Sequence, residues 1–168
     1  ANEQTIVSAG GAFGPVTAAV REMIRNGQFT RGLAEWVEYQ DQGGDGGSEF
    51  GLVQRVPVDD FGERHVAVEF SRSSGNTDHC ETGIQQQIGV TLRVHSSLRL
   101  AADIWIEEQS PPGGGEMHTE YPLILKVTYV DLQGQPREWW HGFYIQPGQT
   151  PEPEGRATLI ERGVWRHV

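Results

Sequence analysis

The sequence predicts an all-β protein and, more closely, a two-sheet β-sandwich. Apolar and polar residues alternate along several short segments, which is the period of a strand with one buried face. Glycine (22 residues) and proline (9 residues) are abundant in a chain of 168 residues, and both favour tight turns over long helices. Hydrophobic residues make up only 36% of the chain, and this mixture suits many short strands joined by turns.

The alternation is clearest over residues 98–107. There Leu98, Leu100, Ala102, Ile104 and Ile106 share one parity, against Arg99, Asp103, Trp105 and Glu107 on the other. Similar alternation predicts strands at 65–71, 84–91, 123–129 and 137–146. Five or more strands without long helices between them indicate a sandwich or a jelly roll.

The connecting segments carry turn chemistry. Asp131–Gly134 is short enough to join two strands as a hairpin, and the stretch at 110–115 separates two others. The glycine-rich residues 41–47 and the proline- and glycine-rich residues 147–155 predict surface loops. We therefore expect residues 1–25 to form a lead-in, either a short helix or an extended segment, and residues 26–168 to form a single β-sandwich domain.

The charge of the chain argues against two classes of partner. Its 23 acidic residues outnumber its 13 basic residues, which gives a formal net charge of −10. Such a chain is repelled by a phosphate backbone and by an anionic lipid surface, so we expect no nucleic-acid partner. The sequence has no apolar run of the roughly 18 residues that a membrane-spanning helix needs. We therefore expect no direct membrane insertion.

Several motifs resemble a known family. The pattern Asn26-Gly27-x-Phe29, followed by Gly32-Leu33 and Trp36, resembles the opening of galactose-binding-like jelly rolls, especially carbohydrate-binding modules. The later blocks 120–123, 129–134 and 141–144 are similar to a domain that follows the FecR-type region in bacterial envelope and signalling proteins. The resemblance covers residues 22–166 and implies a jelly-roll β-sandwich, an extracytoplasmic location and glycan binding. The chain departs from those modules in lacking the Asp of a final strand that helps to hold a structural calcium.

The outward parity of the predicted strands supplies candidate ligand-binding residues. Sugars offer apolar C–H patches and hydroxyl groups, so a surface that binds them needs flat aromatic rings beside carboxylates and amides. The candidates are Glu69, Gln85, Gln87, Asp103, Trp105, Lys126, Trp140 and Tyr144. The alternative is an ordinary solvated sheet face, since outward faces are usually polar for solubility alone.

Two tryptophan positions can be predicted from parity. Ile104 and Ile106 belong in the core, which places Trp105 outward, and we expect it on the same face as Gln85, Gln87 and Lys126. Trp139 shares its parity with Phe143, so we expect Trp139 to point inward and Trp140 outward.

The metal signals are sparse. Asp41 and Asp45, in the glycine-rich loop, form a candidate calcium ligand pair, because calcium prefers oxygen ligands on flexible backbone. A plain solvated loop is the alternative. The six histidines have none of the spacings typical of a transition-metal site.

No sequence motif indicates catalysis. Asp103 and Glu107 share a parity, but four residues of strand separate them by about 13 Å, too far for the paired carboxylates of a glycosidase. We therefore predict a non-catalytic binding domain that recognises carbohydrate. The first alternative is a protein-interaction or sensory domain of a bacterial envelope protein with no glycan ligand. The second is a glycoside hydrolase whose carboxylates converge from separate strands.

Overall fold

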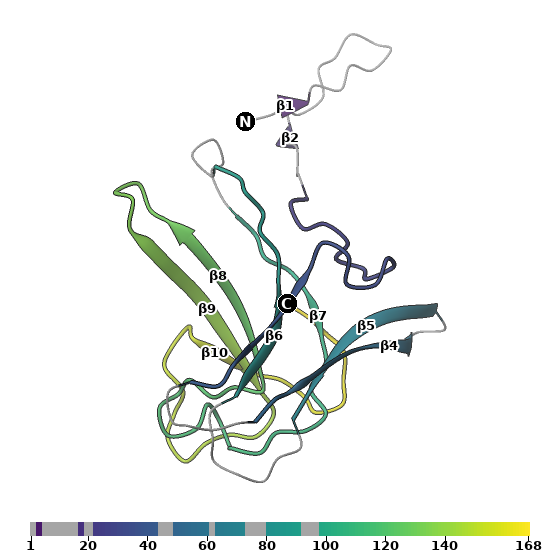
Figure 1. Cartoon of the computed structure of the whole chain (residues 1–168). Helices are drawn as coiled ribbons and strands as arrows, with labels where there is room; N and C mark the ends of the chain where they lie inside the picture. The colour runs from purple at the N-terminus through teal and green to yellow at the C-terminus, as the bar shows by residue number, and fades with distance from the viewer. Residues whose placement is uncertain are drawn as a thin grey trace, which may run out of the picture. The chain divides into compact units, whose positions relative to one another are not determined.

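The computed structural model describes residues 3–4, 17–18, 22–43, 49–60, 63–72, 80–91 and 98–168. Within these ranges the chain forms eleven strands and no helix (Figure 1). The all-β prediction is therefore confirmed for this part of the chain. It also contains no helix with the length and apolar character that crossing a membrane requires. By internal contacts the chain divides into two compact units, Ala1–Ser96 and Ser97–Val168, which we describe in turn.

The described residues of the first unit form three two-stranded antiparallel sheets. They pair β1 (Glu3–Gln4) with β2 (Thr17–Ala18), β3 (Val37–Asp41) with β6 (Glu81–Gln85), and β4 (Leu52–Asp60) with β5 (Glu63–Ser71). The strand predicted at 65–71 is confirmed as part of β5. The strand predicted at 84–91 is wrong beyond Gln85, since Ile88 and Val90 lie exposed after the end of β6. The pairing with β3 ends at Val37 opposite Gln85, which leaves the later residues without that partner.

In the lead-in segment the structure describes two short strands before residue 22. Glu3 and Gln4 pair with Ala18 and Thr17 in an antiparallel ladder. The other residues up to 21 lie outside the described residues, as does Asp45 in the glycine-rich loop.

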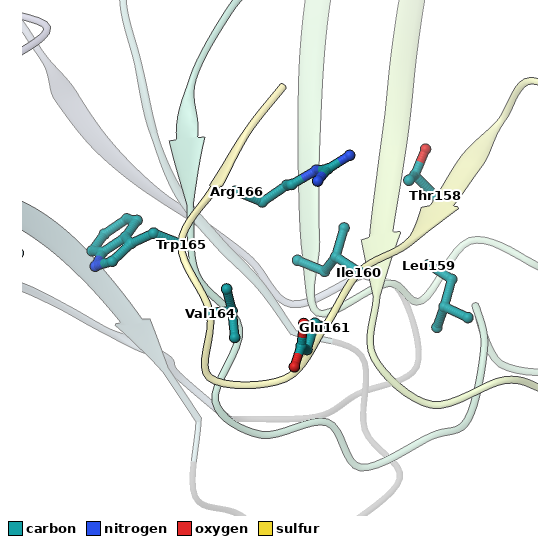
Figure 2. A pocket seen from close by; sticks show the side chains of 7 residues that line it. All are labelled: Thr158, Leu159, Ile160, Glu161, Val164, Trp165 and Arg166. Carbon is teal, nitrogen blue, oxygen red and sulfur yellow. The ribbon is translucent and has the colours of Figure 1, made fainter.

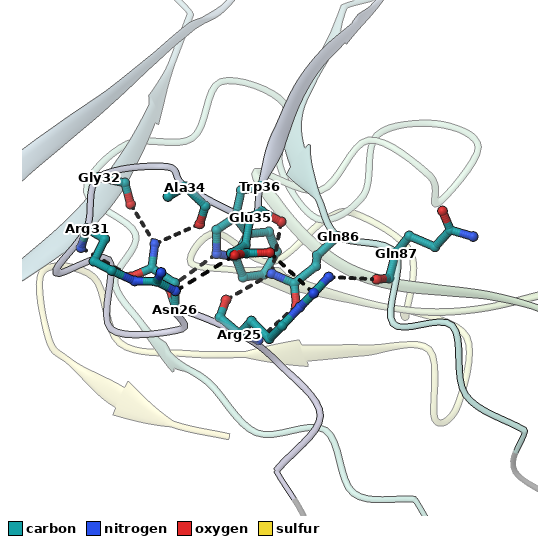
Figure 3. A network of polar contacts seen from close by, with 9 residues as sticks. All are labelled: Arg25, Asn26, Arg31, Gly32, Ala34, Glu35, Trp36, Gln86 and Gln87. Atoms are coloured by element: carbon teal, nitrogen blue, oxygen red, sulfur yellow. Dashed lines mark hydrogen bonds and ion pairs between the residues drawn. The ribbon is translucent and has the colours of Figure 1, made fainter.

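The chain makes a tight turn at Asn26 (Figure 3). The Phe29 amide donates to the Asn26 carbonyl at 3.1 Å, and the Trp36 indole N–H donates to the same carbonyl at 3.2 Å. The Asn26 side-chain amide donates to the carbonyls of Gly32 and Ala34. The Phe29 and Trp36 rings lie 5.7 Å apart. This network holds the segment together, so we assign these residues to folding rather than to binding.

The second unit contains two sheets. In one, β8 (Leu123–Val130) and β9 (Pro136–Tyr144) form an antiparallel hairpin, and β10 (Ala157–Leu159) pairs with β9 in parallel (Figure 1). In the other, β7 (Asp103–Ile104) pairs with β11 (Arg166–His167) in antiparallel. The hairpin turn predicted at Asp131–Gly134 is confirmed: the Asp131 amide donates to the Gln135 carbonyl, and Gly134 takes a φ of 79° that suits glycine.

The long strand predicted over 98–107 is wrong in its extent. Only Asp103–Ile104 forms a regular ladder, and Leu98 is exposed. The reason is the partner. Residues 166–168 run beside residues 102–104, and Ala102 and Val168 exchange two backbone hydrogen bonds. Further along the segment, the Ile106 carbonyl accepts a hydrogen bond from the Gly163 amide in a turn. Alternation predicted the faces of this segment but could not supply a neighbour for it.

The core of the second unit is built by both of its sheets. Ile104, Ile106, Phe143 and Ile160 are buried together, with Leu123 and Leu125 among the partly buried residues packed against them. Burial along β9 changes from end to end rather than from face to face, because residues near the turn are exposed on both faces and residues near Phe143 are buried on both. The hairpin therefore reaches beyond the core at its turn end.

This gradient overturns the predicted exposure of two tryptophans. Trp139 does share the face of Phe143, since it pairs with Val127 while Phe143 pairs with Leu123. It lies nearer the turn, however, and is 44% exposed. Trp140, on the other face, is half-buried, with Tyr121 6.0 Å away and the Arg156 guanidinium 4.9 Å from its ring centre. The prediction of Trp139 inward and Trp140 outward was therefore wrong about which indole is covered.

Candidate functional site

Trp105 is the predicted site residue whose placement is best supported. Its neighbours Ile104 and Ile106 are each 5% exposed and belong to the core. Adjacent residues of an extended segment point in opposite directions, so Trp105 faces outward and is 43% exposed. Its indole N–H donates to the Glu107 carboxylate at 3.1 Å, which fixes the orientation of the ring.

A second aromatic ring and a polar pair surround Trp105. Trp165 packs edge-on against it, with ring centres 5.7 Å apart. The ladder between β7 and β11 sets His167 opposite Asp103, and their side chains are 2.8 Å apart. We call this surface the Trp105 platform. It consists of Asp103, Trp105, Glu107, Trp165 and His167.

Three other candidates lie on strands β8 and β9 of the same unit. Lys126 is the cross-strand partner of Trp140, and both have the parity opposite to Leu125 and Phe143, which pack into or against the core. Tyr144 has that same parity, and its ring lies 6.1 Å from that of Tyr121. The expectation that Lys126 shares a face with Trp105 stays a prediction.

The remaining ligand candidates belong to the first unit. The Glu69 carboxylate accepts a hydrogen bond from the Gln54 amide, its cross-strand partner. Gln85 is exposed at the end of β6, and the Gln87 carbonyl accepts from Arg25 at 3.5 Å. The expectation that Gln85 and Gln87 lie beside Trp105 stays a prediction. Gln86, which the sequence did not single out, bonds the backbone of Arg25 and Glu35 (Figure 3).

The calcium prediction concerns Asp41 and Asp45. The Asp41 carboxylate accepts a hydrogen bond from the Gly43 amide at 2.8 Å, as in a local turn. Asp45 lies outside the described residues, so the pair stays a prediction. Across the part of the chain that is described, no group of three or more His, Cys, Asp or Glu side chains is arranged to hold a metal ion.

A polar cluster that the sequence did not predict joins two loops of the second unit. Its centre is Glu152, whose side chain is 7% exposed. The carboxylate accepts from the Tyr121 hydroxyl, from the Gly114 amide at 3.0 Å, and from His118 Nδ1 at 2.9 Å. His118 Nε2 lies 3.4 Å from the Thr150 hydroxyl. The loop at 147–155, predicted as a surface loop, therefore carries a buried carboxylate.

The surroundings of this cluster shift the pKa values of two of its groups, Tyr121 and Glu152. Burial, with the adjacent Glu152 carboxylate, raises the pKa of the Tyr121 hydroxyl well above its usual range. Burial alone would raise the pKa of Glu152 as well. Hydrogen bonds from Tyr121, His118 and Gly114 outweigh it and hold the Glu152 pKa below its ordinary value. Glu152 is therefore ionised at neutral pH and accepts from all three groups.

Tyr121 and His118 are held by unusual local structure. The Tyr121 ring lies directly over Gly142 of β9 and beside Gly114, and at both positions a Cβ atom would collide with the ring. His118 has a φ of 54°, a left-handed conformation that is uncommon for residues other than glycine. Strain of this kind persists where surrounding contacts over-determine it.

A hollow of about 240 Å³ lies in the segment from 158 to 166 (Figure 2). It is lined by Thr158, Leu159, Ile160, Glu161, Val164, Trp165 and Arg166. Its volume is below the roughly 300–1,000 Å³ of typical ligand pockets. In Figure 2 the Trp165 indole points away from Ile160 and Arg166. Trp165 thus belongs both to the lining of this hollow and to the Trp105 platform.

The chain was also compared with known proteins. No protein-family model, no curated protein and no solved structure matches it.

Proposed function

We propose that this chain is an extracytoplasmic binding domain, a β-sandwich of the galactose-binding-like jelly-roll type, that recognises carbohydrate on the Trp105 platform. The observation that carries the proposal is the half-exposed Trp105 ring, oriented by Glu107 and flanked by Trp165. The binding step at this surface is non-catalytic.

The chemistry of the platform suits a neutral sugar. An indole face that is open to solvent can stack on the C–H patch of a pyranose ring, while carboxylates and an imidazole can bond its hydroxyls. Glu107 and Asp103 supply the carboxylates, and His167 supplies the imidazole. The net charge of −10 disfavours sulfated or other polyanionic glycans. A neutral glycan is therefore the ligand class that we propose.

One observation favours a second candidate, a protein-interaction domain. Four large apolar residues are exposed near the turn end of the β8–β9 hairpin: Tyr129, Val130, Leu132 and Trp139. Exposed apolar groups of this kind are typical of contact surfaces. We rank this candidate second because the residues show no polar partners that would define a specific ligand.

Trp105→Ala is expected to weaken glycan binding by roughly 5- to 150-fold, which corresponds to about 1–3 kcal/mol for a stacked aromatic residue. A glycan array identifies the ligand, and titration followed by tryptophan fluorescence gives the dissociation constant. Trp139→Ala is the matched control, since Trp139 is 44% exposed in the same unit but lies outside the platform. The Trp139→Ala variant should bind the glycan with the same affinity as the original chain.

Two results would count against the proposal. Equal loss of affinity in both variants would show that binding does not depend on the platform. Silence across the array, with self-association or partner capture that Trp139→Ala abolishes, would favour the interaction domain instead.

A further inference from the structure

The Glu152 cluster is arranged as a relay that ends at the surface. Glu152 is nearly buried, the His118 side chain is 24% exposed, and Thr150 is exposed. The three side chains follow one another through His118, with Nδ1 2.9 Å from the Glu152 carboxylate and Nε2 3.4 Å from the Thr150 hydroxyl. A contact between nucleophile and base is often longer before substrate binds than during reaction. A carboxylate, an imidazole and a hydroxyl in this order are the parts of a hydrolytic triad.

The hydrogen bonds also determine which nitrogen of His118 carries its proton. The ionised Glu152 carboxylate can only accept, so Nδ1 of His118 must donate to it. In the neutral ring Nε2 is then an acceptor, and it faces the Thr150 hydroxyl. Tyr121 and the Gly114 amide hold the carboxylate in place from the other side. The imidazole is thus oriented to take a proton from Thr150.

The other two histidines within residues 98–168 make only part of this arrangement. His141 Nε2 lies 2.8 Å from the Thr158 hydroxyl, with Trp139 and Phe143 as its ring contacts rather than a carboxylate. His167 pairs with the Asp103 carboxylate, and the two side chains are well exposed. His118 alone in this range combines a carboxylate on one nitrogen with a hydroxyl on the other.

We propose that Thr150, His118 and Glu152 form a nucleophile–base–acid triad that hydrolyses small esters of carboxylic acids, an activity separate from carbohydrate binding at the Trp105 platform. Small acyl groups are the substrate class because Thr150 lies open to solvent, where a compact ester can approach its hydroxyl. Thr150 and His118 are the catalytic residues, and Glu152 is a positioning residue.

The reaction balances without a cofactor. The Thr150 Oγ1 atom attacks the ester carbonyl carbon, and its proton passes to His118 Nε2. The bond to the alcohol oxygen then breaks, the imidazolium returns the proton to that oxygen, and the alcohol leaves. Water, deprotonated by the same nitrogen, attacks the acyl group on Thr150 and releases the carboxylic acid, while Thr150 regains its proton. The net change is ester and water to acid and alcohol.

Hydrolysis of p-nitrophenyl acetate by the full chain tests the proposal. Thr150→Val keeps the shape of the side chain without its hydroxyl, and it should lower the rate at least about 100-fold, as should His118→Asn. Thr150→Ser should restore activity. Glu152→Gln should lower kcat at unchanged KM.

Mass spectrometry of a quenched reaction should find an acetyl group on Thr150. Circular dichroism checks that each variant is folded.

His141→Asn is the matched control for reactivity of a surface imidazole, and it should keep the full rate. A rate that Thr150→Val leaves unchanged but His118→Asn abolishes would overturn the proposal, because His118 would then be the nucleophile. A rate equal in all folded variants would overturn it as well. Neither result bears on glycan binding, which the Trp105→Ala comparison tests by itself.

Discussion

Replacing Phe143 with alanine is expected to lower the free energy of unfolding by about 3–5 kcal/mol. Phe143 is 4% exposed and lies in a cluster of four buried residues with Ile104, Ile106 and Ile160. Removing the ring takes away its burial and leaves a cavity that the sheets cannot fully close, because β9 is held on one side by β8 and on the other by β10. Urea unfolding followed by circular dichroism measures the change.

Trp139→Ala provides the comparison for Phe143, since both aromatic residues share one strand and one face. Trp139 is 44% exposed, so we expect its loss to cost about 1 kcal/mol, the scale of partial apolar burial. Equal losses for the two variants would contradict the placement of the core near the Tyr144 end of β9.

The strands that alternation predicted best are those with a long partner. β8 and β9 pair over eight residues each, and alternation had marked 123–129 and 137–146 as strands. Alternation also marked 98–107, yet only Asp103 and Ile104 form a ladder there, with His167 and Arg166. The β4 strand escaped prediction. It contains Pro57, a residue that argues against a strand interior, and the two-stranded sheet tolerates it because Pro57 lies at an edge.

The candidate site was predictable where it depended on local parity. Trp105 lies between two core isoleucines, and that is enough to turn it outward. Parity could not place Trp165 against it, because that contact depends on how the segment after 160 returns to β7.

The Glu152 cluster lay beyond prediction for a different reason. His118 and Glu152 are 34 residues apart, and both lie outside the strands that alternation predicts. Loops rich in glycine and proline carry no periodic signal, and so nothing in the pattern brings these side chains together. The one sequence signal near this cluster is the block 120–123. Its Tyr121 is buried, and the Tyr121 hydroxyl donates a hydrogen bond to Glu152.

Glu152→Gln is expected to lower the free energy of unfolding at neutral pH by about 2–4 kcal/mol, the scale for leaving buried donors without an acceptor. The carboxylate accepts from Tyr121, His118 and Gly114, and the side chain is 7% exposed. Glutamine has nearly the same shape, but its amide group would point a donor at other donors. Urea unfolding at pH 7 measures the loss. Glu154→Gln, an exposed position in the same loop, should change stability by less than about 0.5 kcal/mol.

The Glu152 carboxylate also makes the free energy of unfolding of the original chain depend on pH, and Glu152→Gln removes this dependence. The hydrogen bonds hold the folded pKa of Glu152 below its unfolded value of about 4.5, so the contribution of the carboxylate is complete above that pH. It is lost as the pH falls through the folded pKa, because the folded state then takes up the proton that the unfolded state already holds. The stability difference between the original chain and Glu152→Gln should therefore shrink as the pH falls below about 4.5. A difference that stays constant from pH 7 to pH 3 would show that Glu152 contributes by packing and not by its charge.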